Sequence, residues 1–162
     1  CVAGGLMIAL AELGWEVSGI DITDKAIVAA RALFARHGVR GELAVADATK
    51  WVPPQRYDLV TNTFALPATR EAQAQVFATA RAALAPGGTL LLKDFDPSMR
   101  AQHPAFEHYH LPSVEELVAD FGELEIVRAE VVETPIHDHA RKHVQGEPRW
   151  TAAFLHARRA GR

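Results

Sequence analysis

Apolar and polar positions follow two patterns along the chain, one typical of helices and the other of strands. Apolar residues spaced three or four positions apart predict helices over residues 4–13, 24–37, 70–84 and 113–121. Short, nearly continuous apolar runs predict strands over residues 16–20, 42–46, 57–61, 89–92, 124–133 and 150–157. Strands of this kind are typical of buried parallel sheets.

Residues that cap helices stand at the ends of these segments. Gly14 is placed to end the first helix, and Thr23 is a good N-cap for the second. Ser113 with Glu116 three positions later is the sequence signature of a capping box. The run Ala-Pro-Gly-Gly at residues 85–88 is expected to stop the third helix.

The order of these elements, α-β-α-β-β-α-β-α-β-β, predicts a single α/β domain over residues 1–162. Such alternation is typical of a Rossmann-like three-layer sandwich, with a mainly parallel sheet and helices on both faces. No helix separates the last two predicted strands, so we expect them to form an antiparallel hairpin at one edge of the sheet. Residues 95–112 are expected to be irregular.

Composition limits the partners more than the fold. A formal net charge of -3 over 162 residues argues against a general affinity for nucleic acid or acidic membranes. No apolar run approaches the roughly 20 residues that cross a bilayer. The single cysteine, Cys1, excludes an intrachain disulfide and favours a reducing compartment, so we expect a cytoplasmic location. The oligomeric state stays open.

Five segments resemble motifs of the class I S-adenosylmethionine-dependent methyltransferase family, in the family's order. They are residues 1–5 (Cys-Val-Ala-Gly-Gly), 15–21 (Trp-Glu-Val-Ser-Gly-Ile-Asp), 43–47 (Leu-Ala-Val-Ala-Asp), 57–62 (Tyr-Asp-Leu-Val-Thr-Asn) and 84–92 (Leu-Ala-Pro-Gly-Gly-Thr-Leu-Leu-Leu). The resemblance implies methyl transfer from S-adenosylmethionine. Because the short chain offers no second domain for a macromolecular substrate, we expect a small-molecule acceptor.

The chain departs from the family pattern at its start. The family's glycine-rich loop reads acidic-x-Gly-x-Gly-x-Gly after the first strand, whereas the acidic residue, the first glycine and that strand are absent here. Val2 stands where the middle glycine is usual, and its Cβ would crowd a cofactor that the backbone approaches closely. We therefore expect the chain to begin inside this loop, with the first strand missing.

The resemblance assigns cofactor binding to residues at the carboxyl ends of strands, where ligands collect in open α/β sheets. Gly4 and Gly5 precede a helix whose first N–H groups would meet the methionine carboxylate. Asp21 would accept hydrogen bonds from both ribose hydroxyls, and Ile22 would pack on the adenine face.

Two later strand ends extend the expected cofactor site. By the same resemblance, Asp47 would accept a hydrogen bond from the adenine amino group, and the Ala48 N–H would meet the ring. Asn62 follows the next strand, where the transferred methyl group and the nucleophile would meet.

The acceptor is expected beyond the strands predicted at residues 57–61 and 89–92. Phe64, Asp94 and Tyr109 are placed on that substrate side, and His108 and His110 are candidate acid/base residues. A methyl group on a sulfonium is already activated, so a base is needed only if the nucleophile arrives protonated. Either histidine is therefore useful but not required.

His137, His139 and His143 superficially resemble a metal cluster. The stretch has no cysteine partner, and the neighbouring Arg141 and Lys142 would repel a cation. We expect a surface loop there and no metal.

Two other functions fit parts of the pattern. Asp21 would also suit the ribose of a nicotinamide-dependent reductase, although no Tyr-x-x-x-Lys pair is present, and an antiparallel last strand would argue against that class. The second alternative is a degenerate, non-catalytic fragment that kept the fold and lost the cofactor. Val2 and the missing strand favour that alternative.

Overall fold

The chain forms two compact units, Cys1–Val52 and Pro53–Arg162. The computed structural model describes residues 4–134 and 150–161. Each unit has a sheet and a buried core of its own. That the two together make one domain stays a prediction.

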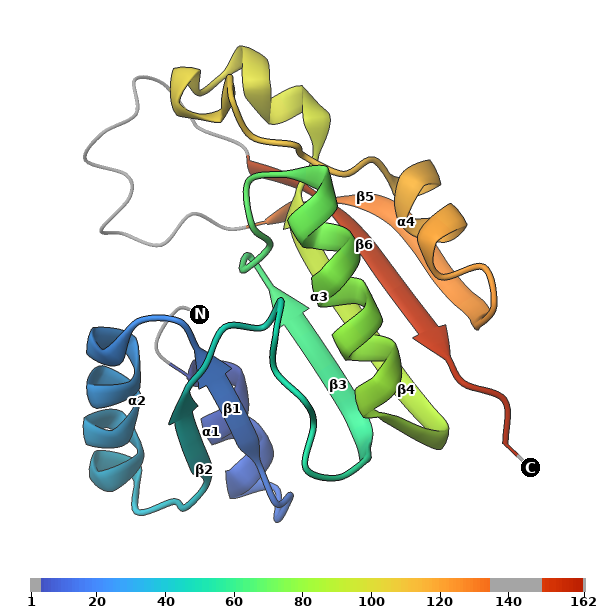
Figure 1. Ribbon diagram of the computed structural model, residues 1–162. Helices are drawn as coiled ribbons and strands as arrows, with labels where there is room; N and C mark the ends of the chain where they lie inside the picture. The colour runs from blue at the N-terminus through green and yellow to red at the C-terminus, as the bar shows by residue number, and fades with distance from the viewer. Residues whose placement is uncertain (1–3, 135–149, 162) are drawn as a thin grey trace. The chain divides into compact units, whose positions relative to one another are not determined.

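The first unit is a two-stranded parallel sheet with two helices (Figure 1). Its elements are α1 (Gly5–Glu12), β1 (Ser18–Asp21), α2 (Asp24–His37) and β2 (Glu42–Val45). The strands pair in register from Ser18 opposite Glu42 to Asp21 opposite Val45. α2 buries Ile27, Ala30 and Phe34 at helical spacing, which leaves its other side to solvent.

The second unit is a four-stranded mixed sheet in the order β3-β4-β6-β5. Its elements are β3 (Tyr57–Thr63), α3 (Arg70–Ala83), β4 (Leu84–Phe95), the 3₁₀ helices η1 (Pro97–Ala101) and η2 (Pro104–Phe106), α4 (Val114–Asp120), β5 (Glu125–Thr134) and β6 (Trp150–Arg158). β3 and β4 are parallel, whereas β6 runs antiparallel to both β4 and β5.

The α/β class and the antiparallel final strand predicted from the sequence are confirmed. The strand direction argues against the nicotinamide-dependent alternative. The last two strands also form the expected antiparallel pair at one edge, because β5 ends the order β3-β4-β6-β5 and pairs with β6. The described strands form two sheets, since β1 and β2 pair only with each other among them.

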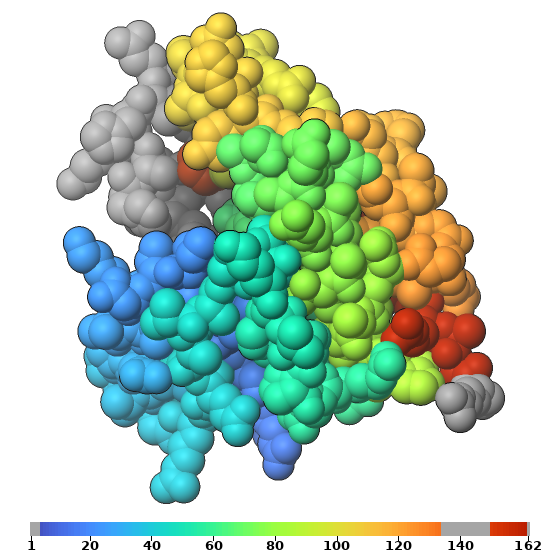
Figure 2. All heavy atoms as spheres, viewed as in Figure 1, coloured from blue at the N-terminus to red at the C-terminus, as the bar shows by residue number. Residues whose placement is uncertain are grey.

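The core of the second unit lies between its sheet and two helices, α3 and α4, which cover the same face of it (Figure 1). The rings of Phe77 on α3 and Phe121 after α4 have centroids 5.1 Å apart. Arg81 also donates to the Asp120 carbonyl (2.9 Å), which ties the two helices together. Figure 2 shows α3 at the surface between the segment around η1 and α4. Small residues of β6, Ala153 and Ala157, belong to this core and face the two helices.

The order of helices and strands agrees with the prediction, and two segments differ in detail. Residues 85–88, expected to be only a stop, fall within β4 at an irregularity of its pairing with β3. Leu84 pairs with Tyr57 and Thr89 with Leu59, and Gly87 between them is left-handed at φ 75°. Residues 95–112 contain two 3₁₀ helices. The first begins because Asp96 accepts the Ser98 N–H and Pro97 is preset for a helix start. Within the described residues, no helix is long and apolar enough to cross a membrane.

Candidate functional site

The chain enters α1 through a turn that requires glycine. Gly4 is buried and has φ 74°, in the left-handed region that glycine adopts without strain. A Cβ at Gly4 would lie 3.3 Å from Cε2 of Phe34, so the backbone must stay bare here. Gly5 is exposed with open space around it, and its helix starts without a side-chain cap. The first N–H groups of α1 are therefore not used by a capping side chain.

Asp21 ends β1 with its carboxylate fixed by the residue two positions on. Its Oδ1 accepts hydrogen bonds from the Thr23 N–H (2.9 Å) and the Thr23 hydroxyl (2.7 Å). Burial raises the pKa of Asp21, but these hydrogen bonds outweigh it and hold the pKa below its ordinary value. Asp21 is therefore an ionised, oriented acceptor at neutral pH. Thr23 occupies the predicted N-cap position of α2, but its hydroxyl serves Asp21 instead of the helix.

Asp47 repeats this arrangement just beyond β2. Its Oδ1 accepts from the Thr49 N–H (2.9 Å) and hydroxyl (2.7 Å), and Lys50 Nζ lies 3.8 Å from its Oδ2. The Thr49 hydrogen bonds lower the pKa of Asp47. Since Asp21 pairs with Val45 in the parallel sheet, both carboxylates stand at the same, carboxyl end of it. Sequence reasoning predicted this placement.

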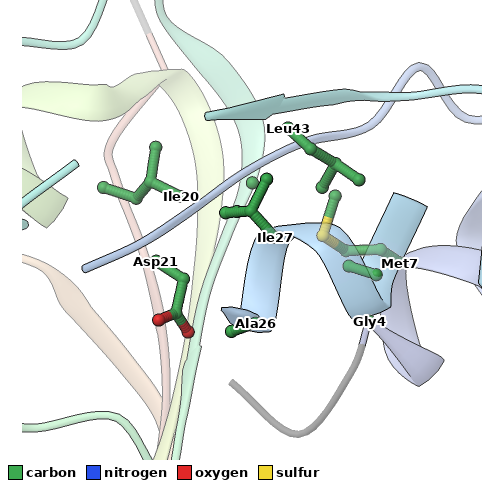
Figure 3. A pocket seen from close by; sticks show the side chains of 9 residues that line it. Gly4, Met7, Ile20, Asp21, Ala26, Ile27 and Leu43 are labelled. Atoms are coloured by element: carbon green, nitrogen blue, oxygen red, sulfur yellow. The ribbon is translucent and has the colours of Figure 1, made fainter. Parts of the chain in front are cut away.

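The neighbours of these aspartates differ in exposure. Ile22 is 67% exposed, and Ala48 is half-buried. Beneath Asp21 the first unit holds a cavity of about 20 Å³, room for a single water molecule. Figure 3 shows Met7, Ile27 and Leu43 converging on it, while the Asp21 carboxylate points away from Met7 and Leu43. This cavity is an apolar packing void, much too small for a nucleoside.

The end of β3 in the second unit carries an unsatisfied acceptor and a strained residue. Oδ1 of Asn62 is buried and has no hydrogen-bond partner in the described parts of the chain. Phe64 has φ 51°, a left-handed conformation that is uncommon for a residue with a Cβ. Its N–H donates to the Lys93 carbonyl (2.8 Å), which fixes the turn against β4.

Six ring side chains of the second unit form a continuous cluster, which we call the ring cluster. Its members are Phe64, Phe95, His103, Phe106, Tyr109 and Trp150. Phe95 lies at its centre, with centroids 4.7 Å from Phe64, 4.8 Å from Phe106 and 5.2 Å from Trp150. Each ring is partly exposed, so the cluster is not an interior core.

Sequence reasoning placed only Phe64 and Tyr109 of the ring cluster on the substrate side. The signal for the others was the density of aromatic residues in and after the segment expected to be irregular. Beside the cluster, Lys93 Nζ lies 5.6 Å from the Phe64 ring centroid, and burial lowers the pKa of Lys93.

Asp94 follows Lys93 on β4 and is only 6% exposed. Its Oδ1 accepts the Phe95 N–H (2.8 Å), and its Oδ2 accepts the Leu66 N–H (3.0 Å). Burial raises the pKa of Asp94, and the hydrogen bonds from the backbone oppose that rise only in part. Asp94 was expected to touch a substrate, and in the structure both of its oxygens bind backbone.

The histidines of the expected acid/base segment have different surroundings. His108 is exposed, as is Tyr109 at 46%. His110 is half-buried, with its N–H donating to the Ala68 carbonyl (2.7 Å) and its Nε2 3.4 Å from Glu116 Oε1. Ser113 and Glu116 form the predicted capping box, which is confirmed.

No group of three or more potential metal ligands occurs among residues 4–134 and 150–161. His137, His139 and His143 lie outside the described residues, as does Val2.

Comparisons with known proteins point to methyltransferases. A family model described as a methyltransferase domain matches residues 1–88. A curated relative, the ribosomal RNA small subunit methyltransferase C of Alcanivorax borkumensis, is 30% identical over 95 residues, which make up 57% of this chain and 29% of the relative. The chain thus spans less than a third of that relative's length.

Solved structures share the fold. A SAM-dependent methyltransferase of Methanosarcina mazei superposes with a TM-score of 0.76 at 18% identity, covering 99% of this chain and 89% of that one. The N-methyltransferase NodS of Bradyrhizobium japonicum, solved with S-adenosyl-L-homocysteine, gives 0.74 at 17% identity, covering 98% and 74%. By its first 88 residues, the chain belongs to the methyltransferase-domain family, and it shares its fold with these solved methyltransferases.

Proposed function

We propose that the protein transfers a methyl group from S-adenosylmethionine to a small-molecule acceptor. The observation that carries the proposal is the pair Asp21 and Asp47. Both carboxylates stand at the carboxyl end of two parallel strands, and each is oriented by a threonine two residues on. Ligands of open α/β folds collect at this end of the strands.

The residues of the first unit fit an adenosine-containing cofactor. The bare backbone at Gly4 and the start of α1 at Gly5 suit an anionic group such as the methionine carboxylate. Asp21, ionised at neutral pH, suits the two ribose hydroxyls. The exposed side chain of Ile22 offers an apolar surface to adenine.

Two further residues are assigned to the cofactor. Asp47 is proposed to accept a hydrogen bond from the adenine amino group, and the Ala48 N–H is proposed to meet the ring. In the second unit, the buried Oδ1 of Asn62 would gain the N–H donor that it lacks among the described residues. When bound, S-adenosylmethionine supplies a methyl group already activated on a positively charged sulfur. The protein therefore has to align the acceptor and exclude water.

The ring cluster supports an acceptor that is small and at least partly apolar. Phe64 and the half-exposed Tyr109 are its members assigned to the acceptor. His108 and His110 stay candidates for the proton transfer that a protonated nucleophile would need. Rings of this kind offer flat faces for stacking.

An RNA acceptor is the competing candidate, because the curated relative is a ribosomal RNA methyltransferase. The formal net charge of -3 favours the small molecule, since RNA binding draws its affinity from cationic side chains. Fluorescence anisotropy with a labelled ribosomal RNA fragment should detect no binding at physiological salt. A cytoplasmic location stays a prediction that the single cysteine favours.

The experiment that tests the proposal is calorimetric titration with S-adenosylhomocysteine and S-adenosylmethionine. Asp21→Asn should weaken both ligands alike, by roughly tenfold to a hundredfold, because both carry the same ribose. Asp24→Asn, which changes an exposed carboxylate three residues on, is the matched control and should bind as the wild type does. If the wild type binds neither ligand, the chain is the non-catalytic fragment; if Asp21→Asn leaves both affinities unchanged, Asp21 is not a cofactor residue.

A further inference from the structure

The only polar or charged side chains buried among the described residues are Gln73 and Asp94, which are 1% and 6% exposed. Both bind the backbone of one short segment, residues 64–68, which joins β3 to α3. We call it the β3–α3 segment. It is itself partly exposed along its whole length. Two buried polar groups thus hold a stretch that is itself only partly buried, with Leu66 packed against the core.

Asp94 holds the first half of the β3–α3 segment. Its Oδ2 accepts the Leu66 N–H (3.0 Å), and the Ala65 N–H also donates to the carboxylate. Oδ1 accepts the Phe95 N–H (2.8 Å), which stops the carboxylate from turning away. Because Asp94 lies on β4, this half is fastened directly to the sheet.

Gln73 holds the second half from α3. Its Nε2 donates to the Pro67 carbonyl (2.9 Å) and to the His110 carbonyl (2.7 Å). The His110 N–H in turn donates to the Ala68 carbonyl (2.7 Å). The segment is therefore joined to residue 110, beside the ring cluster, as well as to the sheet.

The conformation held in this way is one that the chain would not keep unaided. Phe64 opens the segment at φ 51°, and such backbone persists only where its surroundings over-determine it. Burying a carboxylate is costly, so a site that only needed filling would be better served by an apolar residue. Asp94 and Gln73 make four hydrogen bonds to the backbone of residues 65–67 and 110, and fixing this backbone explains why two polar groups are buried here.

We propose that Asp94 and Gln73 are positioning residues that fix the β3–α3 segment in a single conformation, with the Phe64 ring presented to the acceptor. That the segment faces the acceptor rests on the proposed function. The fixing of its backbone does not. Neither residue touches the reacting atoms; each acts through the segment it holds.

Amide hydrogen exchange followed by NMR tests the fixing directly. Asp94→Asn and Gln73→Met should speed exchange in the β3–α3 segment by roughly tenfold to a hundredfold. The amides of Leu90 and Leu92 in the sheet should keep their wild-type rates. The matched controls are Asp96→Asn, whose carboxylate accepts from Ser98 instead, and Gln75→Met, which changes an exposed position of α3.

A double-mutant cycle separates positioning from plain buttressing. In a Phe64→Gly background, Asp94→Asn should speed exchange by less. Glycine adopts the left-handed conformation without strain, so less strain remains for Asp94 to oppose. Exchange that rises evenly through the whole sheet, or equally in the control variants, would overturn the proposal. So would an equal effect of Asp94→Asn in both backgrounds.

Titration with S-adenosylhomocysteine distinguishes this proposal from the proposed function. Asp94→Asn and Gln73→Met should bind it as the wild type does, since neither residue is assigned to the cofactor. Lost affinity in these variants would overturn the placement of the segment on the acceptor side. A wild type that does not bind it would reject the proposed function, while the exchange results would still decide whether the segment is fixed.

Discussion

Aspartate side chains in this protein have pKa values displaced in opposite directions by their surroundings. Hydrogen bonds from Thr23 and Thr49 lower the pKa of Asp21 and Asp47. Asp94 also accepts N–H groups, yet its burial dominates and raises the pKa. The first two therefore remain ionised in mild acid, whereas Asp94 takes up a proton at a higher pH than an ordinary aspartate.

The raised pKa of Asp94 predicts a particular dependence of stability on pH. Between the ordinary value of 3.8 and the raised value, the folded protein holds a proton that the unfolded chain has lost. The contribution of Asp94 to stability is therefore full below 3.8 and is lost as the pH rises through the raised pKa. Urea unfolding of wild type and Asp94→Asn across this range should show the wild type losing free energy of unfolding relative to the variant. A difference that does not change with pH would contradict this assignment.

The pKa of Asp21 is lowered by the N–H of Thr23 and by its hydroxyl, and the hydroxyl can be removed by substitution. Thr23→Val deletes that donor and leaves the N–H of residue 23 in place, so the pKa of Asp21 should rise towards its ordinary value. Thr49→Val should do the same to Asp47 and leave Asp21 unchanged. Carboxyl ¹³C titration by NMR measures both. The idea fails if each valine variant leaves its own aspartate unmoved.

At the scale of elements, β4 depends on close backbone packing at its start. A Cβ on Gly88 would lie 2.9 Å from the Ala85 carbonyl oxygen and 3.0 Å from that of Tyr57, and neither backbone atom can yield easily. Gly88→Ala should therefore lower the free energy of unfolding by about 1–3 kcal/mol. Gly122→Ala, where the nearest contacts are an ordinary 3.5 Å, should stay near the wild type. Urea unfolding measures both, and equal stability of the two variants would show that the start of β4 adapts.

The same strand shows which elements a sequence can predict. The capping box of Ser113 and Glu116 was predictable because its chemistry lies within four residues. The extension of β4 back to Leu84 was not, because a Pro-Gly-Gly run normally marks a turn and the pairing of Leu84 depends on distant Tyr57. Local chemistry is written in adjacent residues, whereas pairing depends on partners elsewhere in the chain.

The candidate site divides in the same way. Asp21 and Asp47 could be predicted because each directly follows an apolar strand, and their threonine partners are adjacent in sequence. The ring cluster could not, since Phe64 meets Phe95, and Phe95 meets Trp150, only after β3, β4 and β6 have paired. The role of Gln73 could not be predicted either, because its partner His110 is distant in the sequence.

At the scale of the whole molecule, the two units have unequal means of stabilising themselves. Two strands alone are marginal in water, whereas three or more strands packed on helices can be stable. Among residues 4–134 and 150–161, the first unit has two strands and the second has four. We expect amides of β1 and β2 to exchange faster than those of β4 and β6, which lie inside the larger sheet.

Hydrogen exchange with mass spectrometry measures this difference peptide by peptide. Saturating S-adenosylhomocysteine should slow exchange in the first unit, because a ligand protects the state that binds it. Methionine at the same concentration serves as the control ligand, because it lacks the adenosine part. Equal exchange in the two units without ligand would show that they open as one cooperative body.

Three strands of this protein are followed by the same short motif, an aspartate whose carboxylate accepts the N–H and hydroxyl of the residue two positions on. The motifs are Asp21-Ile-Thr, Asp47-Ala-Thr and Asp96-Pro-Ser. Each one closes within three residues, so its geometry does not depend on the length or composition of the loop that comes next. Such loops can gain, lose or exchange residues over evolutionary time while the carboxylate before them keeps its orientation. A fold with this motif at its strand ends can acquire new acceptors through changes in its loop sequences, while the strand ends stay the same.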